Sequence, residues 1–139
     1  MKDCATQENI NVFAVDDSEV ICSLLKITLE KSGLHLTLSR NLGDAKQIVQ
    51  STQFDLIIVD YMLSIEDNGL QLVEFLKETI NAATPVLMLS AEIDEPIKQR
   101  AKQLGVKAWM KKPFSPDSIT ELSQRLLANQ NIKRPTKPN

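Results

Sequence analysis

The sequence predicts an α/β protein in which five parallel strands form a doubly wound central sheet with helices on both faces. Apolar runs of the kind that form buried parallel strands occur at 10–15, 55–60 and 85–89. Segments with helical periodicity follow them, and parallel strands need such crossovers, which are almost always right-handed. Strand and helix alternate five times with short connections, so helices on both faces of one sheet are the economical arrangement.

In the first half of the chain, Ser18 is placed to cap a helix that runs to about residue 31, with Gly33 as its stop. Residues 34–38 alternate between apolar and polar or weakly apolar side chains, which indicates a short second strand. Residues 42–51 form a second, weaker helical pattern. The third strand then ends at Asp60.

In the second half, residues 61–68 are expected to form a loop that Gly69 closes. A third helix should follow to about Asn81, with four residues facing inward: Leu70, Val73, Leu76 and Ile80. The fourth strand ends at Ser90. Asp94 is placed to cap the next helix, which should stop at Gly105. A short fifth strand near 107–110 and a last helix opened by residues 115–116 complete the pattern.

Size and composition predict one globular domain. The chain has 139 residues, 24% of them charged, and a net charge of −2, so no electrostatic argument favours nucleic acid as a direct partner. No apolar run approaches the roughly 20 residues that span a bilayer, and the first residues lack a signal-peptide pattern. We expect a cytoplasmic protein with no membrane contact. We also expect a flexible tail at 1–9, one domain at 10–129, and a disordered tail or truncated linker at 130–139.

The side chains that can carry chemistry stand at the ends of four expected strands. Asp16 and Asp17 follow the first strand, Asp60 ends the third, Ser90 follows the fourth, and Lys112 follows the fifth. The carboxyl ends of parallel strands meet at one edge, which is where open α/β sheets bind ligands. We therefore expect these five side chains to gather at one rim.

Three carboxylates gathered in this way indicate a cation site. At about 4 Å, two carboxylates repel by about 4 kcal/mol at an effective dielectric constant near 20. A divalent cation would offset this repulsion, and carboxylates with a carbonyl and water suit Mg²⁺. No His or Cys cluster favours zinc. An aspartate beside such a metal can act as a nucleophile that forms an acyl phosphate. Lys112 would then supply positive charge, and Ser90 a hydrogen bond, to the transferred group.

Four motifs together resemble the receiver domain of response regulators in two-component signalling, of the kind found in the chemotaxis regulator. They are VDDS at 15–18, IVD at 58–60, LSA at 89–91 and KKPF at 111–114. The similarity runs from about residue 10 to residue 128. It implies a flavodoxin-like fold with the strand order 2-1-3-4-5.

The resemblance also implies roles for single residues at a metal and phosphoryl site. Asp60 would accept the phosphoryl group from a histidine kinase, a histidine phosphotransfer protein or a small acyl phosphate. Asp17 and Asp60 would bind Mg²⁺ directly, with Mn²⁺ as a substitute. Asp16 would act mainly through water, and the backbone carbonyl of Met62 would be a further ligand.

Around the phosphoryl group, the resemblance implies that Lys112 bonds the acyl phosphate and that the Lys112–Pro113 peptide bond is cis. Met62 and Glu92 stand where such domains vary, and there they tune the lifetime of the phosphoryl group. The loop at 61–68 departs from the family pattern. Ser64 stands where a proline is usual, and one residue is added.

A switch follows from phosphorylation, because the new charge and acceptors would draw Ser90 toward the phosphoryl group. Trp109 stands at the family's aromatic switch position and would rotate inward. The face made by the fourth helix, fifth strand and fifth helix would then change for an output domain, a protein partner or a second copy in a homodimer. A fixed aromatic on an edge strand is the alternative for Trp109.

Two other classes of function compete with the signalling switch. The first is a degenerate receiver that acts as a constitutive interaction or dimerisation module; the presence of all five rim residues argues against it. The second is a free-standing enzyme. A phosphohydrolase needs an Asp-x-Asp motif, which Asp60-Tyr61-Met62 lacks, and a flavin protein needs a phosphate loop where Asp16 and Asp17 stand. We therefore expect no enzyme activity beyond phosphorylation and dephosphorylation of Asp60 itself.

Overall fold

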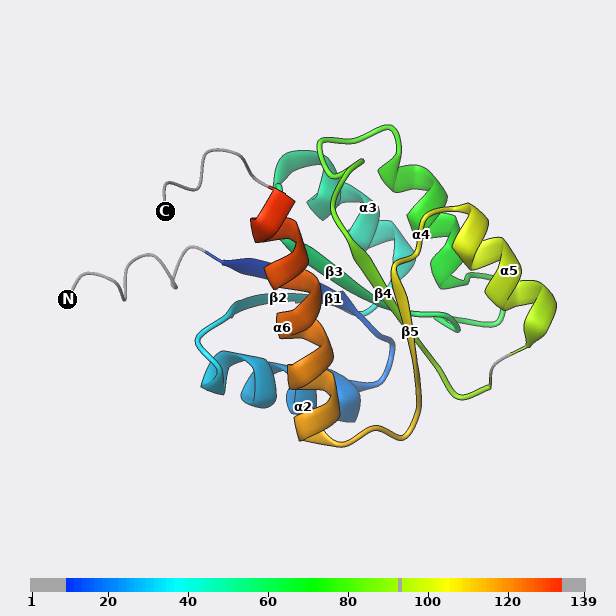
Figure 1. The fold of residues 1–139 in the computed structure, drawn as a ribbon. Coiled ribbons are helices and arrows are strands. Elements are labelled where there is room, and N and C mark those ends of the chain that lie inside the picture. The colour runs from blue at the N-terminus through cyan, green and yellow to red at the C-terminus, as the bar shows by residue number, and fades with distance from the viewer. Residues whose placement is uncertain (1–9, 93, 134–139) are drawn as a thin grey trace.

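The structure, a computed structural model, describes residues 10–92 and 94–133 and places one parallel sheet between two layers of helices (Figure 1). The strand order is β2-β1-β3-β4-β5, as the sequence predicts. The elements in chain order are β1 (Asn11–Val15), α2 (Glu19–Lys31), β2 (His35–Ser39), α3 (Leu42–Ser51), β3 (Leu56–Asp60), α4 (Gly69–Leu76), β4 (Val86–Ser90), α5 (Glu95–Gln103), β5 (Ala108–Lys111) and α6 (Pro116–Lys133).

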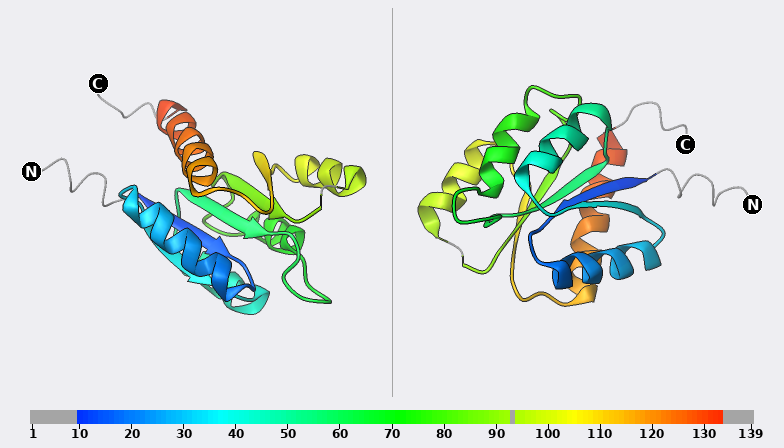
Figure 2. Two further views of the ribbon diagram at one scale, coloured as in Figure 1. Left: turned by 90° about the horizontal axis from the view of Figure 1, so that it is seen from below. Right: turned by 180° about the vertical axis from the view of Figure 1, so that it is seen from behind.

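The strands read as continuous apolar runs because both faces of the sheet are covered. Helices α2 and α6 lie on one face, and α3, α4 and α5 lie on the other (Figure 2). Successive residues of a strand enter opposite cores. On β1, Phe13 packs on the α3–α4–α5 side and Ala14 on the α2–α6 side. All residues of β3 and β4 are buried.

The register of the strands brings their carboxyl ends to one edge. Val15 pairs with Val59, Asp60 with Leu89, and Ser90 with Lys111. Each residue that ends or follows a strand therefore lies beside its counterpart on the next strand. This register is what positions the site.

Local signals explain most helix boundaries. Ser18 accepts a hydrogen bond from the Ile21 backbone N–H at the start of α2, and Gly33 follows that helix with a φ of 92°. Asp94 occupies the N-cap position of α5, but its side chain makes no capping hydrogen bond. A cap bonds the N–H of the second or third helical residue, and the second residue here is Pro96, which has none. Asp94 thus stands at the start of α5 as predicted, but the prediction that its side chain caps the helix is wrong.

Helix α4 is shorter than the sequence predicts. It ends at Leu76 and not near Asn81, and Ile80 is 52% exposed instead of facing inward. The cause is the fully buried Asn81 side chain, which donates to the carbonyls of Val49 and Thr52 and accepts from the Phe54 N–H. These bonds satisfy buried backbone groups before β3 and hold residues 77–84 in turns.

Helix α6 continues to Lys133, four residues beyond the expected domain end at residue 129. The tails at 1–9 and 134–139 lie outside the described residues, and so does Cys4. Within the part of the chain that the structure describes, none of the helices has the length and apolar character that crossing a membrane requires.

Candidate functional site

Three carboxylates meet at the carboxyl edge of the sheet. Asp16 and Asp17 follow β1, Asp60 ends β3, and one carboxylate oxygen of each lies within 4.8 Å of the others. Asp16 is fully buried and Asp60 is 4% exposed, whereas Asp17 is exposed to solvent. The structure thus brings together the three acids that the sequence singles out, and it leaves one side of the cluster open.

The fourth member of the cluster is the ammonium group of Lys112. Its Nζ lies 2.9 Å from Asp16 Oδ2 and 3.2 Å from Asp60 Oδ1. Burial by itself would lower the pKa of Lys112, but the contacts with Asp16 and Asp60 outweigh it and raise the pKa overall. Lys112 therefore stays charged and partly compensates the two buried acids.

Asp60 is hard to ionise in this environment. Burial raises its pKa from 3.8 to about 6, the Asp16 charge adds to the increase, and Lys112 opposes it. Asp60 is therefore mostly ionised at neutral pH but takes up a proton on mild acidification. A carboxylate held in this way is poised to react with an electrophile.

Asp60→Asn is expected to stabilise the metal-free protein at pH 7. Because the folded-state pKa exceeds the unfolded one, the folded protein holds the proton longer, and the free energy of unfolding falls as pH rises from 3.8 to about 6. At pH 7 the raised pKa of Asp60 lowers the free energy of unfolding of the parent by about 3 kcal/mol. Asp60→Asn has no carboxylate to ionise and should regain this amount. Near pH 4 the two proteins should be equally stable. Urea unfolding in EDTA at both pH values measures the difference. The exposed Glu78→Gln is the control, and a parent more stable than Asp60→Asn at pH 7 would contradict the prediction.

The donor atoms at this edge fit a hard divalent cation. The Ser18 N–H donates to Asp16 Oδ1 at 2.9 Å. Asp16 Oδ2, in contrast, is buried and receives no well-aligned hydrogen bond among the described residues, although the Lys112 ammonium lies beside it. A buried carboxylate oxygen in this position gains from an added cation. The donors are all oxygens, which suits Mg²⁺.

The hydrogen bonds around Met62 leave its backbone carbonyl unused within the loop. Met62 forms an antiparallel bridge with Asn68, in which Gly69 N–H donates to the Tyr61 carbonyl and Leu63 N–H to the Asp67 carbonyl. In such a non-hydrogen-bonded pair, the N–H and C=O of the paired residue point away from the other strand. The bridge therefore leaves the Met62 carbonyl without a partner in its own loop.

The loop between Asp60 and Gly69 is stabilised by contacts among its own residues. Leu63 is buried, and the Ser64 hydroxyl accepts from the N–H groups of Glu66 and Asp67. Ile65, between these anchors, is fully exposed. The loop is thus a short closed structure with an apolar tip, joined to the site at the Met62 bridge.

The hydroxyl of Ser90 lies at the end of β4 but faces its own loop. It donates to the Glu92 carbonyl and accepts from the Glu92 N–H. Glu92 is exposed, and the Lys112–Pro113 peptide bond beside this loop is cis. The structure therefore brings the acids and Lys112 together, while the Ser90 hydroxyl is engaged elsewhere.

Trp109 lies on β5, opposite Met88, on the sheet face covered by α5. It is half-buried against the core, and its indole Nε1 is buried without a hydrogen-bond partner in the described part of the chain. An unpaired buried N–H is costly. This side chain is thus held by packing and not by a polar contact.

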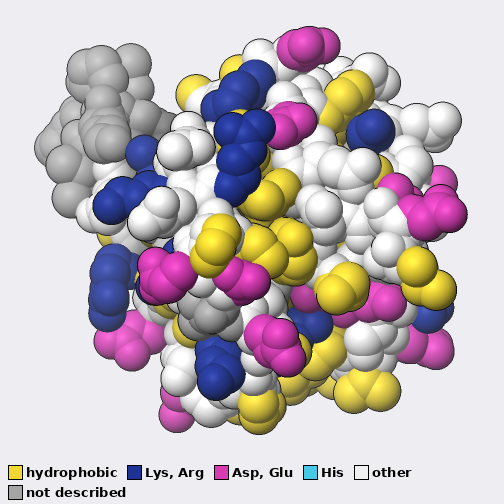
Figure 3. Space-filling model, turned by 90° about the vertical axis from the view of Figure 1, so that its right-hand side faces the viewer, with side chains coloured by type: hydrophobic (Ala, Val, Ile, Leu, Met, Phe, Trp, Pro, Cys, Tyr) yellow, Lys and Arg dark blue, Asp and Glu magenta, His cyan; other side chains and the backbone are white. Residues whose placement is uncertain are grey.

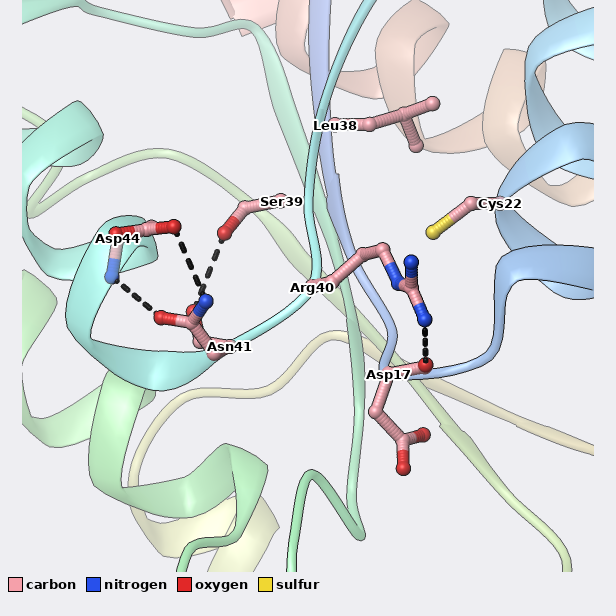
Figure 4. A pocket seen from close by; sticks show the side chains of 7 residues that line it. All are labelled: Asp17, Cys22, Leu38, Ser39, Arg40, Asn41 and Asp44. Atoms are coloured by element: carbon pink, nitrogen blue, oxygen red, sulfur yellow. Dashed lines mark hydrogen bonds between the residues drawn. The ribbon is translucent and has the colours of Figure 1, made fainter.

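Arg40 is a neighbour of the site that the sequence reading missed. Its guanidinium donates to the Asp17 backbone carbonyl at 3.3 Å, across a pocket that Cys22 and Asp44 also line (Figure 4). Arg40 directly follows β2, so the rule that strand ends meet at one edge would have found it. Burial raises the pKa of the Cys22 thiol, and the nearby Asp16 adds to the rise, so its protonated form is favoured.

The fold and site together define a doubly wound α/β protein with an acidic cluster and an ammonium group at its ligand-binding edge. The family model of the response regulator receiver domain matches residues 12–124. The chain belongs to the family of response regulator receiver domains, which are signalling modules of two-component systems.

Individual relatives agree with this assignment. The chain is 31% identical over 128 residues to the alkaline phosphatase synthesis transcriptional regulatory protein PhoP of Bacillus subtilis. The matched region covers 92% of this chain and 52% of PhoP. The chain is also 30% identical over 118 residues to the phosphate regulon transcriptional regulatory protein PhoB of Pseudomonas aeruginosa, over 84% and 50% of the two chains. The chain thus spans about half the length of these relatives.

Solved structures show the same fold. The chemotaxis protein CheY4 of Vibrio cholerae superposes on this chain with a TM-score of 0.79 at 30% identity. The superposed region covers 84% of this chain and 98% of CheY4. The receiver domain of the Francisella response regulator 1452 superposes with a TM-score of 0.78 at 26% identity, over 88% and 99%.

Proposed function

We propose that this protein is a phosphorylatable switch in which Asp60 accepts a phosphoryl group and thereby changes the face formed by α5, β5 and α6. The observation that carries the proposal is the cluster of Asp16, Asp17, Asp60 and Lys112 at one edge of the sheet. A purely structural role does not explain it, since buried like charges oppose folding.

Asp17 and Asp60 would hold a divalent cation, with Asp16 acting through water and the Met62 carbonyl as a further ligand. The donor set is all oxygen, and Asp17 lies on the solvent side where the ion would enter. Bound Mg²⁺ supplies positive charge to the phosphoryl oxygens during transfer. Receiver domains bind Mg²⁺ at this acidic pocket, and Mn²⁺ is an expected substitute.

In the transfer step, an Asp60 carboxylate oxygen attacks the phosphorus of a phosphohistidine or a small acyl phosphate. The new oxygen–phosphorus bond forms as the bond to the donor nitrogen or oxygen breaks, and the donor keeps that electron pair. Lys112, which lies 3.2 Å from Asp60, would transfer its contact to a phosphoryl oxygen.

The switch would depend on Ser90. Its hydroxyl would leave Glu92, move toward the phosphoryl group and donate to it, because the group adds charge and strong acceptors. Trp109, whose indole N–H has no hydrogen-bond partner among the described residues, would then rotate inward. Met62 and Glu92 flank the site and would set the lifetime of the acyl phosphate.

Expected partners are a histidine kinase or a histidine phosphotransfer protein as donor, and an output domain, a protein or a second copy at the switching face. Because the chain spans about half of relatives that are transcriptional regulators, the absence of direct nucleic-acid contact stays a prediction. So do the cytoplasmic location, the receiver boundaries at 10–129 and the lack of further enzyme activity.

The test is the intact mass after incubation with acetyl phosphate and Mg²⁺. The parent should gain one phosphoryl group, and Asp60→Asn should gain none. Asp55→Asn, at the other end of the same strand, is the control that should label. If the parent stays unlabelled while a known receiver labels in parallel, the protein is a constitutive interaction module instead.

A further inference from the structure

Arg40 differs from the other arginines that the structure describes. Arg100 and Arg125 form ion pairs with glutamates, at 2.8 Å and 3.2 Å. Figure 3 looks onto the side of the molecule where α5 lies, and there basic side chains, in dark blue, border acidic ones, in magenta. Arg40 lines a pocket with Asp17 and Asp44, yet within the described residues it forms no ion pair and donates to a backbone carbonyl. A carboxylate is the stronger acceptor for a guanidinium, so this choice of partner is unusual.

The bond from Arg40 spares the carboxylate of Asp17. The guanidinium donates to the Asp17 carbonyl at 3.3 Å, and the carboxylate of the same residue points away from Arg40 (Figure 4). In the described part of the chain, no ion pair engages this carboxylate. An ion pair with Arg40 would compete with a cation for the Asp17 carboxylate. A bond to the carbonyl holds the residue and leaves its carboxylate available.

The peptide groups on both sides of Asp17 are held by neighbouring elements. The Cys22 thiol on α2 donates to the Asp16 carbonyl at 3.2 Å, which fixes the peptide group before Asp17. The peptide group after Asp17 is held at its carbonyl by Arg40, which directly follows β2. The N–H of that second group belongs to Ser18 and donates to Asp16 Oδ1. Because a residue has only two soft backbone dihedrals, fixing both flanking peptide planes fixes the direction of the Asp17 side chain.

Arg40 acts on a nearby cation in two opposite ways. As a positive charge it repels a second cation, whereas as a hydrogen-bond donor it orients a ligand of that cation. The guanidinium is exposed, so water and salt screen its charge, but they do not cancel the orientation of the backbone. Residues that orient metal ligands typically change metal affinity ten- to a hundredfold. Orientation should therefore dominate.

We propose that Arg40 is a positioning residue for the divalent cation, because its bond to the Asp17 carbonyl holds the Asp17 carboxylate within reach of Asp16 and Asp60. The inference deepens the function proposed above and rests on it, since it names a residue outside the acidic cluster that sets the affinity of that cluster for its ion. Arg40 itself touches neither the cation nor the phosphoryl group.

The test is the dissociation constant of Mg²⁺, measured by calorimetry on the full chain without a phosphoryl donor. Arg40→Met should bind Mg²⁺ about tenfold more weakly, the lower end of the expected range because the bond is exposed. Arg40→Lys should recover most of this loss, since an ammonium on a long stem still donates to the carbonyl. Arg125→Met removes the same charge from the exposed face of α6 and should bind as the parent does.

Two further measurements separate orientation from charge and from general stability. The ratio of the dissociation constants of Arg40→Met and the parent should persist at about 0.5 M salt, where interactions between exposed charges are screened. Urea unfolding in EDTA should give nearly the same midpoint for Arg40→Met and the parent, because a substitution at an exposed side chain changes stability little. A purely structural role would instead lower that midpoint and leave the Mg²⁺ affinity unchanged.

Tighter Mg²⁺ binding by Arg40→Met would show that the charge of Arg40 dominates and would overturn the proposal. So would an affinity equal to that of the parent, an Arg40→Lys variant that binds no better than Arg40→Met, or a parent that binds no Mg²⁺. If the affinities follow the expected order but acetyl phosphate never labels the parent at Asp60, the positioning role stands and the proposed switch fails. If the parent labels while Arg40→Met binds Mg²⁺ as the parent does, the switch stands and the positioning role fails.

Discussion

Gly69→Ala should destabilise the protein by about 3 kcal/mol and weaken phosphorylation of Asp60. A Cβ at Gly69 would lie 2.5 Å from the Asp60 carbonyl oxygen and 3.1 Å from Val59 Cγ2. Backbone on both sides leaves little room to adjust, because the Gly69 N–H is also bonded to the Tyr61 carbonyl at 2.6 Å. The start of α4 or the end of β3 must shift, and a shift at the end of β3 would move Asp60, the proposed phosphoacceptor.

Gly43→Ala is the matched control. It also places alanine in the first turn of a helix, but its Cβ would meet only Asn41 Oδ1, at 3.5 Å. It should stabilise by about 0.5–1 kcal/mol, because alanine is the better helix former. Urea unfolding and the rate of labelling by acetyl phosphate, read by intact mass, compare the two. If both variants gain stability, the close approach at Gly69 is not limiting.

Lys112→Met should destabilise the metal-free protein by about 3 kcal/mol at pH 7, since it leaves Asp16 and Asp60 buried without their cation. The loss should shrink near pH 5. Lys112 lowers the pKa of Asp60, so in its absence that pKa should climb above its present value of about 6. Asp60 is then protonated at pH 5, so the repulsion disappears.

Magnesium separates this electrostatic effect from lost packing. Added Mg²⁺ should stabilise Lys112→Met more than it stabilises the parent, because the ion takes over the missing positive charge, yet labelling by acetyl phosphate should remain slow. Lys111→Met, an exposed neighbour, is the control and should match the parent in urea unfolding at both pH values. If the loss of stability in Lys112→Met depends on neither pH nor Mg²⁺, then the packing of the lysine stem and not its charge stabilises the protein.

The fold and the gathering of the rim followed from the sequence because both depend on strand ends. A buried parallel strand is a run of apolar residues, and the side chain that follows it must lie at the common edge. Asp16, Asp17, Asp60 and Lys112 all obey this rule, and so does Arg40, to which the rule was not applied. The end of α4 did not follow, because Asn81 acts through backbone groups far away in sequence.

The orientation of Ser90 could not be read from the sequence. A serine that follows a strand can turn toward the rim or bond its own loop, and here Glu92 supplies both partners. The departure at Ser64 is now explained in part. Its hydroxyl accepts two backbone N–H groups, a contact that proline in this place could not provide.

The bridge between Met62 and Asn68 separates the tip of its loop from the edge of the acidic cluster. An extra residue placed beyond the bridge lengthens the tip and leaves the Met62 carbonyl, the proposed metal ligand, where it was. We therefore expect insertions and deletions around Ile65 to destabilise the protein less than changes at residues 60–62 or 68–69. Under the proposed function, a change of residues at the tip would alter the surface that a phosphoryl donor meets without moving Asp60.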